Sequence, residues 1–178
     1  MIFYRIFVVS FLSLFSACVT ASKDYKEQTV DQVDLPRFMG KWYVIASIPT
    51  IFEKNATNAV ETYTLKRDGT IDVDFRYHKN TVDGPLKVMT QQAFVIDKET
   101  NAYWKIRPLW PFLFDYLVID LESKDYSYTV IGRPNKQNLW IMAREPSLSE
   151  KVYNSILTKV EAMGYDLNAI IKVPQKWD

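Results

Sequence analysis

The chain has 178 residues, which is enough for one domain with a sizeable core and too few for two comfortable ones. Its 22 Lys and Arg nearly balance 21 Asp and Glu, and no run of five or more basic residues occurs, so we expect no nucleic-acid partner. The single cysteine excludes an intramolecular disulfide, so the fold must be stabilised by packing, to which the 15% of aromatic residues contribute.

Residues 1–17 have the layout of a secretory signal peptide: Arg5 precedes an apolar run over 6–15, and small residues follow. The apolar run is about half of the ~20 residues that a membrane-spanning helix needs. Cys18 comes next, and the sequence FSAC resembles the bacterial lipobox, whose cysteine is diacylated and becomes the mature N-terminus. We therefore predict lipid attachment at Cys18. The alternative is cleavage after Ala21, which would discard the cysteine.

Residues 18–33 are polar without a sustained period, which predicts a tether between a lipidated N-terminus and a domain over 34–178. Within the domain, short runs rich in β-branched and aromatic residues alternate with turn signals, of which Asp68-Gly69 is a strong hairpin signal. These runs predict eight strands, over 41–48, 59–66, 70–78, 86–97, 102–107, 115–121, 126–132 and 138–144.

One amphipathic helix follows the strands. Ser147 and Glu150 have the spacing of a capping box, and Gly164 is a suitable helix end. Between them, apolar residues recur at helical spacing, at Val152, Ile156, Val160 and Met163. The run 169–173 predicts a short final strand at the sheet edge.

Eight antiparallel strands joined by hairpins can close into a barrel, which removes the exposed edges, or they can form a sandwich. The consecutive hairpins, the single helix after the last long strand and the many alternating aromatics favour closure. The expected fold is therefore all-β: an eight-stranded antiparallel up-and-down barrel with one C-terminal α-helix and a short final strand.

Three sequence blocks point to a known family. Gly40-Lys41-Trp42 opens the first strand, DYLVIDL forms the sixth, and LWIMAREP contains Arg144 at the end of the eighth. In order and spacing they resemble the signature of the lipocalins over residues 34–174, and in particular that of the bacterial outer-membrane lipocalins. The resemblance implies a barrel that holds a small hydrophobic ligand. It also implies that Arg144 lies over Trp42 at the closed end, where Gly40, Trp42 and Arg144 are structural.

Side chains alternate between the two faces of a strand, so an inward-pointing Trp42 and Arg144 set the parity of their strands. With the other strands matched to the family, the expected ligand-binding set is Val44, Ala46, Tyr63, Val73, Phe75, Tyr77, Val95, Trp104, Ile106, Tyr116, Val118, Trp140 and Met142. This apolar and aromatic set suits an acyl chain. Any of these side chains could instead simply fill the barrel.

The segment RPLWPFLF, residues 107–114, joins the fifth and sixth expected strands and is placed at the open mouth of such a barrel. Its apolar cluster could guard the ligand entrance, touch the membrane, pair subunits or pack internally.

The expected protein is a non-enzymatic lipocalin, anchored to the bacterial outer membrane and facing the periplasm, that stores or transports fatty acids or lysophospholipids. A lipocalin-fold enzyme acting on a bound lipid is the alternative, for which the chain offers tyrosines, Glu61 and His78. A soluble periplasmic carrier of another hydrophobic ligand is a further one. We expect neither a cofactor nor a metal site, because the carboxylates are dispersed without metal-ligand spacing. A homodimer is left open.

Overall fold

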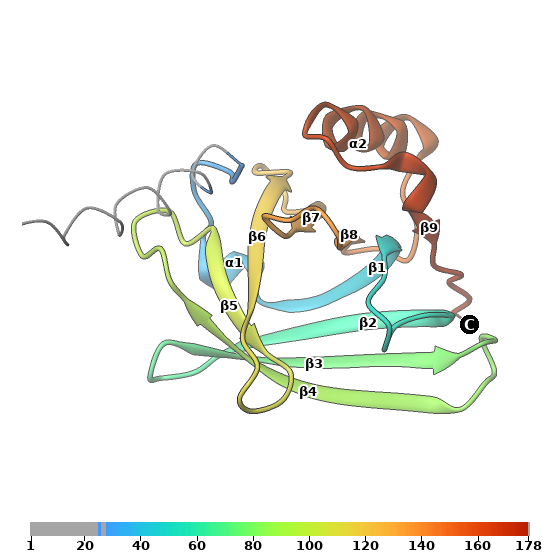
Figure 1. The fold of residues 1–178 in the computed structure, drawn as a ribbon, viewed down its shortest axis with the longest axis horizontal. Coiled ribbons are helices and arrows are strands. Elements are labelled where there is room, and N and C mark those ends of the chain that lie inside the picture. The colour runs from blue at the N-terminus through green and yellow to red at the C-terminus, as the bar shows by residue number, and fades with distance from the viewer. Residues whose placement is uncertain (1–24, 26–27, 178) are drawn as a thin grey trace, which may run out of the picture.

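The computed structural model describes residue 25 and residues 28–177 (Figure 1). The strands are β1 (Gly40–Ile48), β2 (Ala56–Leu65), β3 (Thr70–Lys79), β4 (Leu86–Val95), β5 (Tyr103–Arg107), β6 (Phe114–Leu121), β7 (Tyr128–Gly132), β8 (Leu139–Ala143) and β9 (Ile171–Lys172). The helices are α1 (Leu35–Phe38), α2 (Glu150–Ala162) and the short 3₁₀ helix η1 (Leu167–Ala169).

The eight long strands form a closed barrel. Each strand from β2 to β7 pairs antiparallel with the next in the sequence, and β1 closes the sheet by pairing with both β8 and β2. The short strand β9 adds to β1. The predicted up-and-down barrel is confirmed, including the hairpin at Asp68-Gly69, where Gly69 has a φ of 82°.

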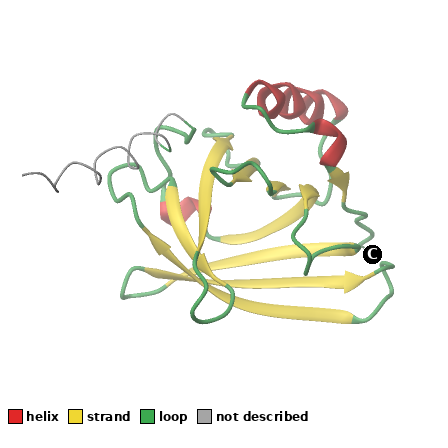
Figure 2. Cartoon of the chain, viewed as in Figure 1, coloured by secondary structure: helices red, strands yellow, loops and turns green. Residues whose placement is uncertain are grey.

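Helix α2 lies outside the barrel (Figure 2). Ile156 and Val160 of α2 are fully buried, in a cluster with residues from β1, β6, β7 and β8. The helix begins after Ser149, whose side chain accepts a hydrogen bond from the N–H of Val152, so the expected capping box at Ser147 is wrong. Gly164 follows the end of the helix with a φ of 86°, as predicted. Among the described residues, no helix has the length and hydrophobicity that spanning a membrane requires.

A β-bulge in β1 overturns one expected interior position. The register between β1 and β8 shifts between Val44 and Ala46, which places an extra residue, Ile45, in the strand. Val44 packs inside the barrel, whereas Ala46 is buried outside it, in the cluster beneath α2. The inward placement of Ala46 is therefore wrong, because the extra residue reverses the parity of the strand from that point on.

The folded part begins earlier than the expected tether allows. The N–H of Val30 donates to the carbonyl of Val118 at 2.9 Å, and Val33 is fully buried in the interior cluster. The ring of Tyr25 lies 4.4 Å from that of Tyr103. Residues 28–33 are thus packed onto the barrel, and the expected boundary at residue 34 is corrected. Cys18 and the predicted signal peptide lie outside the described residues.

The aromatic core closes one end of the barrel. Asp34 caps the one-turn helix α1, which places the fully buried Phe38 within 5.5 Å of the rings of Trp42, Tyr63 and Trp104. The indole N–H of Trp42 donates to the carbonyl of Phe38 at 2.8 Å. These rings leave little room at this end, so an open cavity must lie toward the other.

The predicted pairing of Arg144 with Trp42 is present at this closed end. The guanidinium carbon of Arg144 lies 3.7 Å from the centre of the Trp42 ring. Its nitrogens donate to the carbonyls of Lys41 and Arg37 at 2.7 Å each. Gly40 has a φ of 93°, a conformation that disfavours other residues. The contact between Arg144 and Trp42 is the one that the resemblance implies, and a structural role for Gly40, Trp42 and Arg144 stays a prediction.

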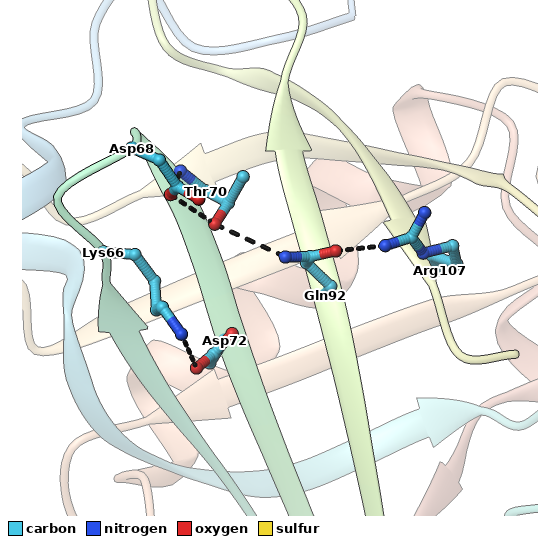
Figure 3. A network of polar contacts seen from close by, with 6 residues as sticks. All are labelled: Lys66, Asp68, Thr70, Asp72, Gln92 and Arg107. Atoms are coloured by element: carbon cyan, nitrogen blue, oxygen red, sulfur yellow. Dashed lines mark hydrogen bonds and ion pairs between the residues drawn. The ribbon is translucent and has the colours of Figure 1, made fainter.

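Polar contacts on the outer face of the barrel hold β3, β4 and β5 in register (Figure 3). Asp68 accepts from the hydroxyl of Thr70 at 2.7 Å, and Gln92 lies between Thr70 and Arg107, contacting both. Arg107 thus faces outward, while its neighbour Ile106 faces the interior.

Candidate ligand-binding cavity

A cavity of about 460 Å³ occupies the half of the barrel opposite α1. The loops β1–β2, β5–β6 and β7–β8 surround its mouth, and strands β2, β4, β5, β6 and β8 supply its deeper wall. Much of the wall is apolar, with Phe52, Met89, Ile106, Pro108, Phe114 and Trp140. The volume lies within the range typical of small-molecule sites.

Of the residues expected to bind ligand, Ile106, Tyr116 and Trp140 line this cavity. The others that face inward pack in the interior cluster without being part of the cavity wall, and these are Val44, Tyr63, Val73, Phe75, Tyr77, Val95, Trp104, Val118 and Met142. Trp104 stacks on Tyr116 at 5.2 Å and helps to fill the closed half, whereas Tyr77 lies toward the mouth, where its hydroxyl donates to the carbonyl of Phe52. The alternation of side chains along a strand predicts which residues face the interior of the barrel, but not which of them line an open cavity.

The cavity floor carries a buried carboxyl group that sequence reasoning did not place there. Glu61 of β2 is only 6% exposed, and a carboxyl oxygen contacts the hydroxyl of Tyr63. That hydroxyl also lies 2.6 Å from the hydroxyl of Tyr116. Burial, with the nearby charge of Glu53, raises the pKa of Glu61 to about 8. At neutral pH the floor therefore presents a mostly neutral acid, which can donate as well as accept a hydrogen bond.

A second carboxyl group, Glu53, lies in the β1–β2 loop and also lines the cavity. It accepts hydrogen bonds from the N–H of Thr50 at 3.0 Å and from the indole N–H of Trp140 at 3.2 Å. Burial raises its pKa, and these donors oppose the rise. Within residues 28–177, neither Glu53 nor Glu61 forms an ion pair, so neither has a bonded cation there.

Charged groups also lie at the rim of the cavity, on β6 and the β7–β8 loop. Arg133, at the start of the β7–β8 loop, and Asp115 of β6 both line it. Lys105 and the hydroxyl of Tyr103 donate to Asp115 at 2.5 and 2.6 Å. Burial would raise the pKa of Asp115, but these hydrogen bonds, with the charges of Lys105 and Arg133, outweigh it and lower the pKa. Asp115 is therefore a paired carboxylate.

Exposed apolar side chains surround the mouth. We call this set the mouth patch: Ile51, Phe52, Leu109, Trp110, Phe112 and Leu113, from the β1–β2 and β5–β6 loops. Ile51 is 83% exposed and Trp110 is 78% exposed, which is unusual for such large apolar residues. The 107–114 segment therefore lies at the open mouth as predicted, and its side chains at 109–113 do not pack internally.

Several residues of the cavity were missed by sequence reasoning, and they differ in whether the alternation of side chains along a strand could have placed them. Glu61 shares the parity of Tyr63 in β2 and could have been placed inside by the same alternation. Glu53, Arg133 and Asn138 lie in or beside loops, which have no period from which an inward direction can be read. His78, considered for chemistry, points away from the cavity wall and lies with Nδ1 2.7 Å from the carbonyl of Gly84.

Comparison with known proteins decides the family. The model of the lipocalin-like domain matches residues 33–175. The chain belongs to the lipocalin family. The outer membrane lipoprotein Blc of Vibrio cholerae is 27% identical to this lipocalin over 171 residues, which cover 96% of this chain and 98% of Blc. Temperature-induced lipocalin-1 of Arabidopsis thaliana is 32% identical over 157 residues, covering 83% and 82% of the two chains.

Solved structures agree on the lipocalin architecture. Insecticyanin from the tobacco hornworm Manduca sexta superimposes with a TM-score of 0.64, at 16% identity, over 85% of this lipocalin and 84% of insecticyanin. At this identity the likeness shows the fold alone. As a lipocalin, the protein has a barrel of the size that holds one small hydrophobic molecule.

Proposed function

We propose that this lipocalin binds fatty acids or lysophospholipids and stores or transports them for membrane maintenance. The observation that carries the proposal is the 460 Å³ cavity, open at one end and lined by Phe52, Met89, Ile106 and Trp140. An acyl chain that enters it gains about 0.8 kcal/mol for each buried methylene group. The wall also carries polar and charged side chains, among them Glu61, Asp115 and Arg133, which suits an amphiphile better than a uniformly apolar molecule.

The proposal includes attachment to a bacterial outer membrane on the periplasmic side. It rests on the FSAC sequence at Cys18 and on the likeness to proteins named outer membrane lipoprotein, one of which aligns over 96% of this chain. In this proposal residues 1–17 are a signal peptide and Cys18 carries the lipid. Cleavage after Ala21 would instead give a soluble periplasmic carrier.

The mouth patch supports exchange of ligand with a bilayer. It surrounds the entrance to the cavity, and large exposed apolar patches mark contacts with apolar partners. An amphiphile leaving a membrane would then pass from one apolar surface to another. A homodimer formed through the same surface is the competing arrangement.

Ligand titration tests the binding function. Trp140 lines the cavity, so delipidated protein should show saturable quenching of its fluorescence by dodecanoate or by a lysophospholipid. Trp140→Phe removes the reporting ring and should leave the quenching much reduced while the other tryptophans remain. Absence of saturable quenching by every acyl ligand would contradict the proposal.

One observation supports a second function, an enzyme acting on a bound lipid. Glu61, with a pKa of about 8, converges with Tyr63 and Tyr116 at the floor, and such shifted groups are frequent in acid–base catalysis. The binding function is preferred because the cavity wall contains no serine, cysteine or histidine among the described residues. Hydrolysis of an ester of dodecanoic acid that is lost in Glu61→Gln would favour the enzyme.

A further inference from the structure

Arg133 is held rigidly at the rim of the cavity. Its backbone N–H donates to the hydroxyl of Tyr165, and that hydroxyl donates to the Arg133 carbonyl, both at 3.2 Å. The preceding residue is Gly132, where a Cβ atom would lie 2.2 Å from the same hydroxyl. Only glycine therefore allows Tyr165 to approach and fix the backbone at this position.

The guanidinium group is fixed as well. Nη1 of Arg133 donates to Oδ1 of Asn138 at 2.9 Å, and the guanidinium carbon lies 4.9 Å from the centre of the Phe114 ring. Asn138 is itself only 9% exposed and donates to the carbonyl of Ile48 at 3.3 Å. A side chain held on two sides in this way presents its remaining donors in a fixed direction.

One of those donors lacks a partner. Nε of Arg133 is buried and has no hydrogen-bond partner among the described residues. Within residues 28–177 Arg133 forms no ion pair, and the nearby Asp115 is bonded to Lys105 instead. Buried donors are normally satisfied, and the common partners of a guanidinium group are carboxylate and phosphate oxygens. Because Arg133 lines the cavity, a carboxylate or phosphate oxygen of a ligand is the group best suited to bind its guanidinium group there.

The floor of the same cavity disfavours an anion. Glu61 supplies a buried carboxyl group there, near Glu53 of the β1–β2 loop, and neither has a bonded cation among the described residues. An anion placed beside Glu61 would therefore be buried without a cation to compensate its lost hydration. The cavity thus has a cationic site at the β7–β8 side of its rim and a buried floor that disfavours charge. This polarity gives an amphiphile one favourable orientation.

We propose that Arg133 binds the anionic group of the ligand, a carboxylate or a phosphate, and that the apolar chain points from this rim toward Glu61 and Tyr116. The inference rests on the proposed lipid-binding function and specifies its ligand class as anionic amphiphiles. Arg133 is then the residue that distinguishes an anionic lipid from a neutral one of equal chain length.

The test uses three ligands of one chain length, dodecanoate, dodecyl phosphate and 1-dodecanol, titrated below micelle formation at about pH 7. Trp140 fluorescence reports binding to the full-length protein and to Arg133→Gln. We expect Arg133→Gln to weaken binding of the anions by about 10-fold or more, as loss of a charge-assisted hydrogen bond does, and to change dodecanol by less than about twofold. The anion with the larger loss identifies the headgroup class, carboxylate or phosphate.

Lys136 provides the matched control, since it is an exposed cation in the same loop and does not line the cavity. Lys136→Gln should leave all three affinities unchanged. Arg133→Lys, which keeps the charge but not the planar donors, should recover part of the loss. Circular dichroism and urea unfolding confirm that each variant is folded.

The outcomes separate the two proposals. If Arg133→Gln weakens dodecanol as much as the anions, or weakens none of them, the inference is overturned while lipid binding stands. If the wild-type protein binds none of the three ligands, both the proposed function and the inference fail.

Discussion

The carboxyl group of Glu61 should make the free energy of unfolding depend on pH, and Glu61→Gln should remove that dependence. Burial, with the charge of Glu53, raises the pKa of Glu61 from 4.5 to about 8. Between these values the folded protein binds more protons than the unfolded chain. The contribution of Glu61 to stability is therefore fully present below about pH 4.5 and is lost as the pH rises through about 8.

The size of the effect follows from the shift. A rise of the pKa from 4.5 to about 8 corresponds to about 5 kcal/mol at most, because each pKa unit is worth ~1.4 kcal/mol. Gln keeps the size of the neutral acid and can still bond to Tyr63, but it cannot be charged. We expect the two proteins to agree within about 1 kcal/mol at about pH 5, and Glu61→Gln to be more stable by several kcal/mol at about pH 9.

Urea unfolding of ligand-free protein, followed by tryptophan fluorescence at about pH 5, 7 and 9, measures this difference. Glu145→Gln at an exposed carboxyl group is the control and should change the profile by only about a few tenths of a kcal/mol. Parallel pH profiles for the wild type and Glu61→Gln would mean that Glu61 ionises as an ordinary carboxyl group. That result would refute the assignment of a neutral acid to the cavity floor.

Three further substitutions test other parts of the structure. Arg144→Ala removes the contact with Trp42 and the bonds to two carbonyls, so urea unfolding should show a loss of about 2–4 kcal/mol. Gly132→Ala places a Cβ atom 2.2 Å from the hydroxyl of Tyr165, and the same assay should show a loss of about 1–3 kcal/mol. Trp110→Ser in the mouth patch should leave dodecanoate affinity unchanged but slow the transfer of a fluorescent fatty acid from vesicles; an unchanged rate would argue against membrane contact.

The barrel could be predicted because its determinants are local. Alternation of apolar residues defines the strands, and the turn at Asp68-Gly69 defines the hairpin of β2 and β3. Arg144 is far from Gly40 and Trp42 in the sequence, yet each of the three residues meets a geometric requirement that the family signature describes. The observed φ of 93° at Gly40 and the 3.7 Å contact of Arg144 with Trp42 are those requirements.

The rest depends on three-dimensional packing, which leaves no period in the sequence. One extra residue, Ile45, reverses the parity of β1 and moves Ala46 out of the barrel. The cavity is the space that the rings at the closed end do not fill, so it depends on how Phe38 and its neighbours stack. Arg133 acquires its position from Tyr165, which lies 32 residues later in the chain.

Native mass spectrometry of the protein isolated from its own membranes tests the central claim, lipid binding, most directly. The account predicts one anionic amphiphile per chain and a mature N-terminus that begins at a lipid-modified Cys18. A mature mass beginning at Ser22 without lipid would contradict the anchor and leave lipid binding intact. A chain that carries no amphiphile, and that takes up no dodecanoate when it is added, would contradict the assignment of this barrel as a lipid-binding protein.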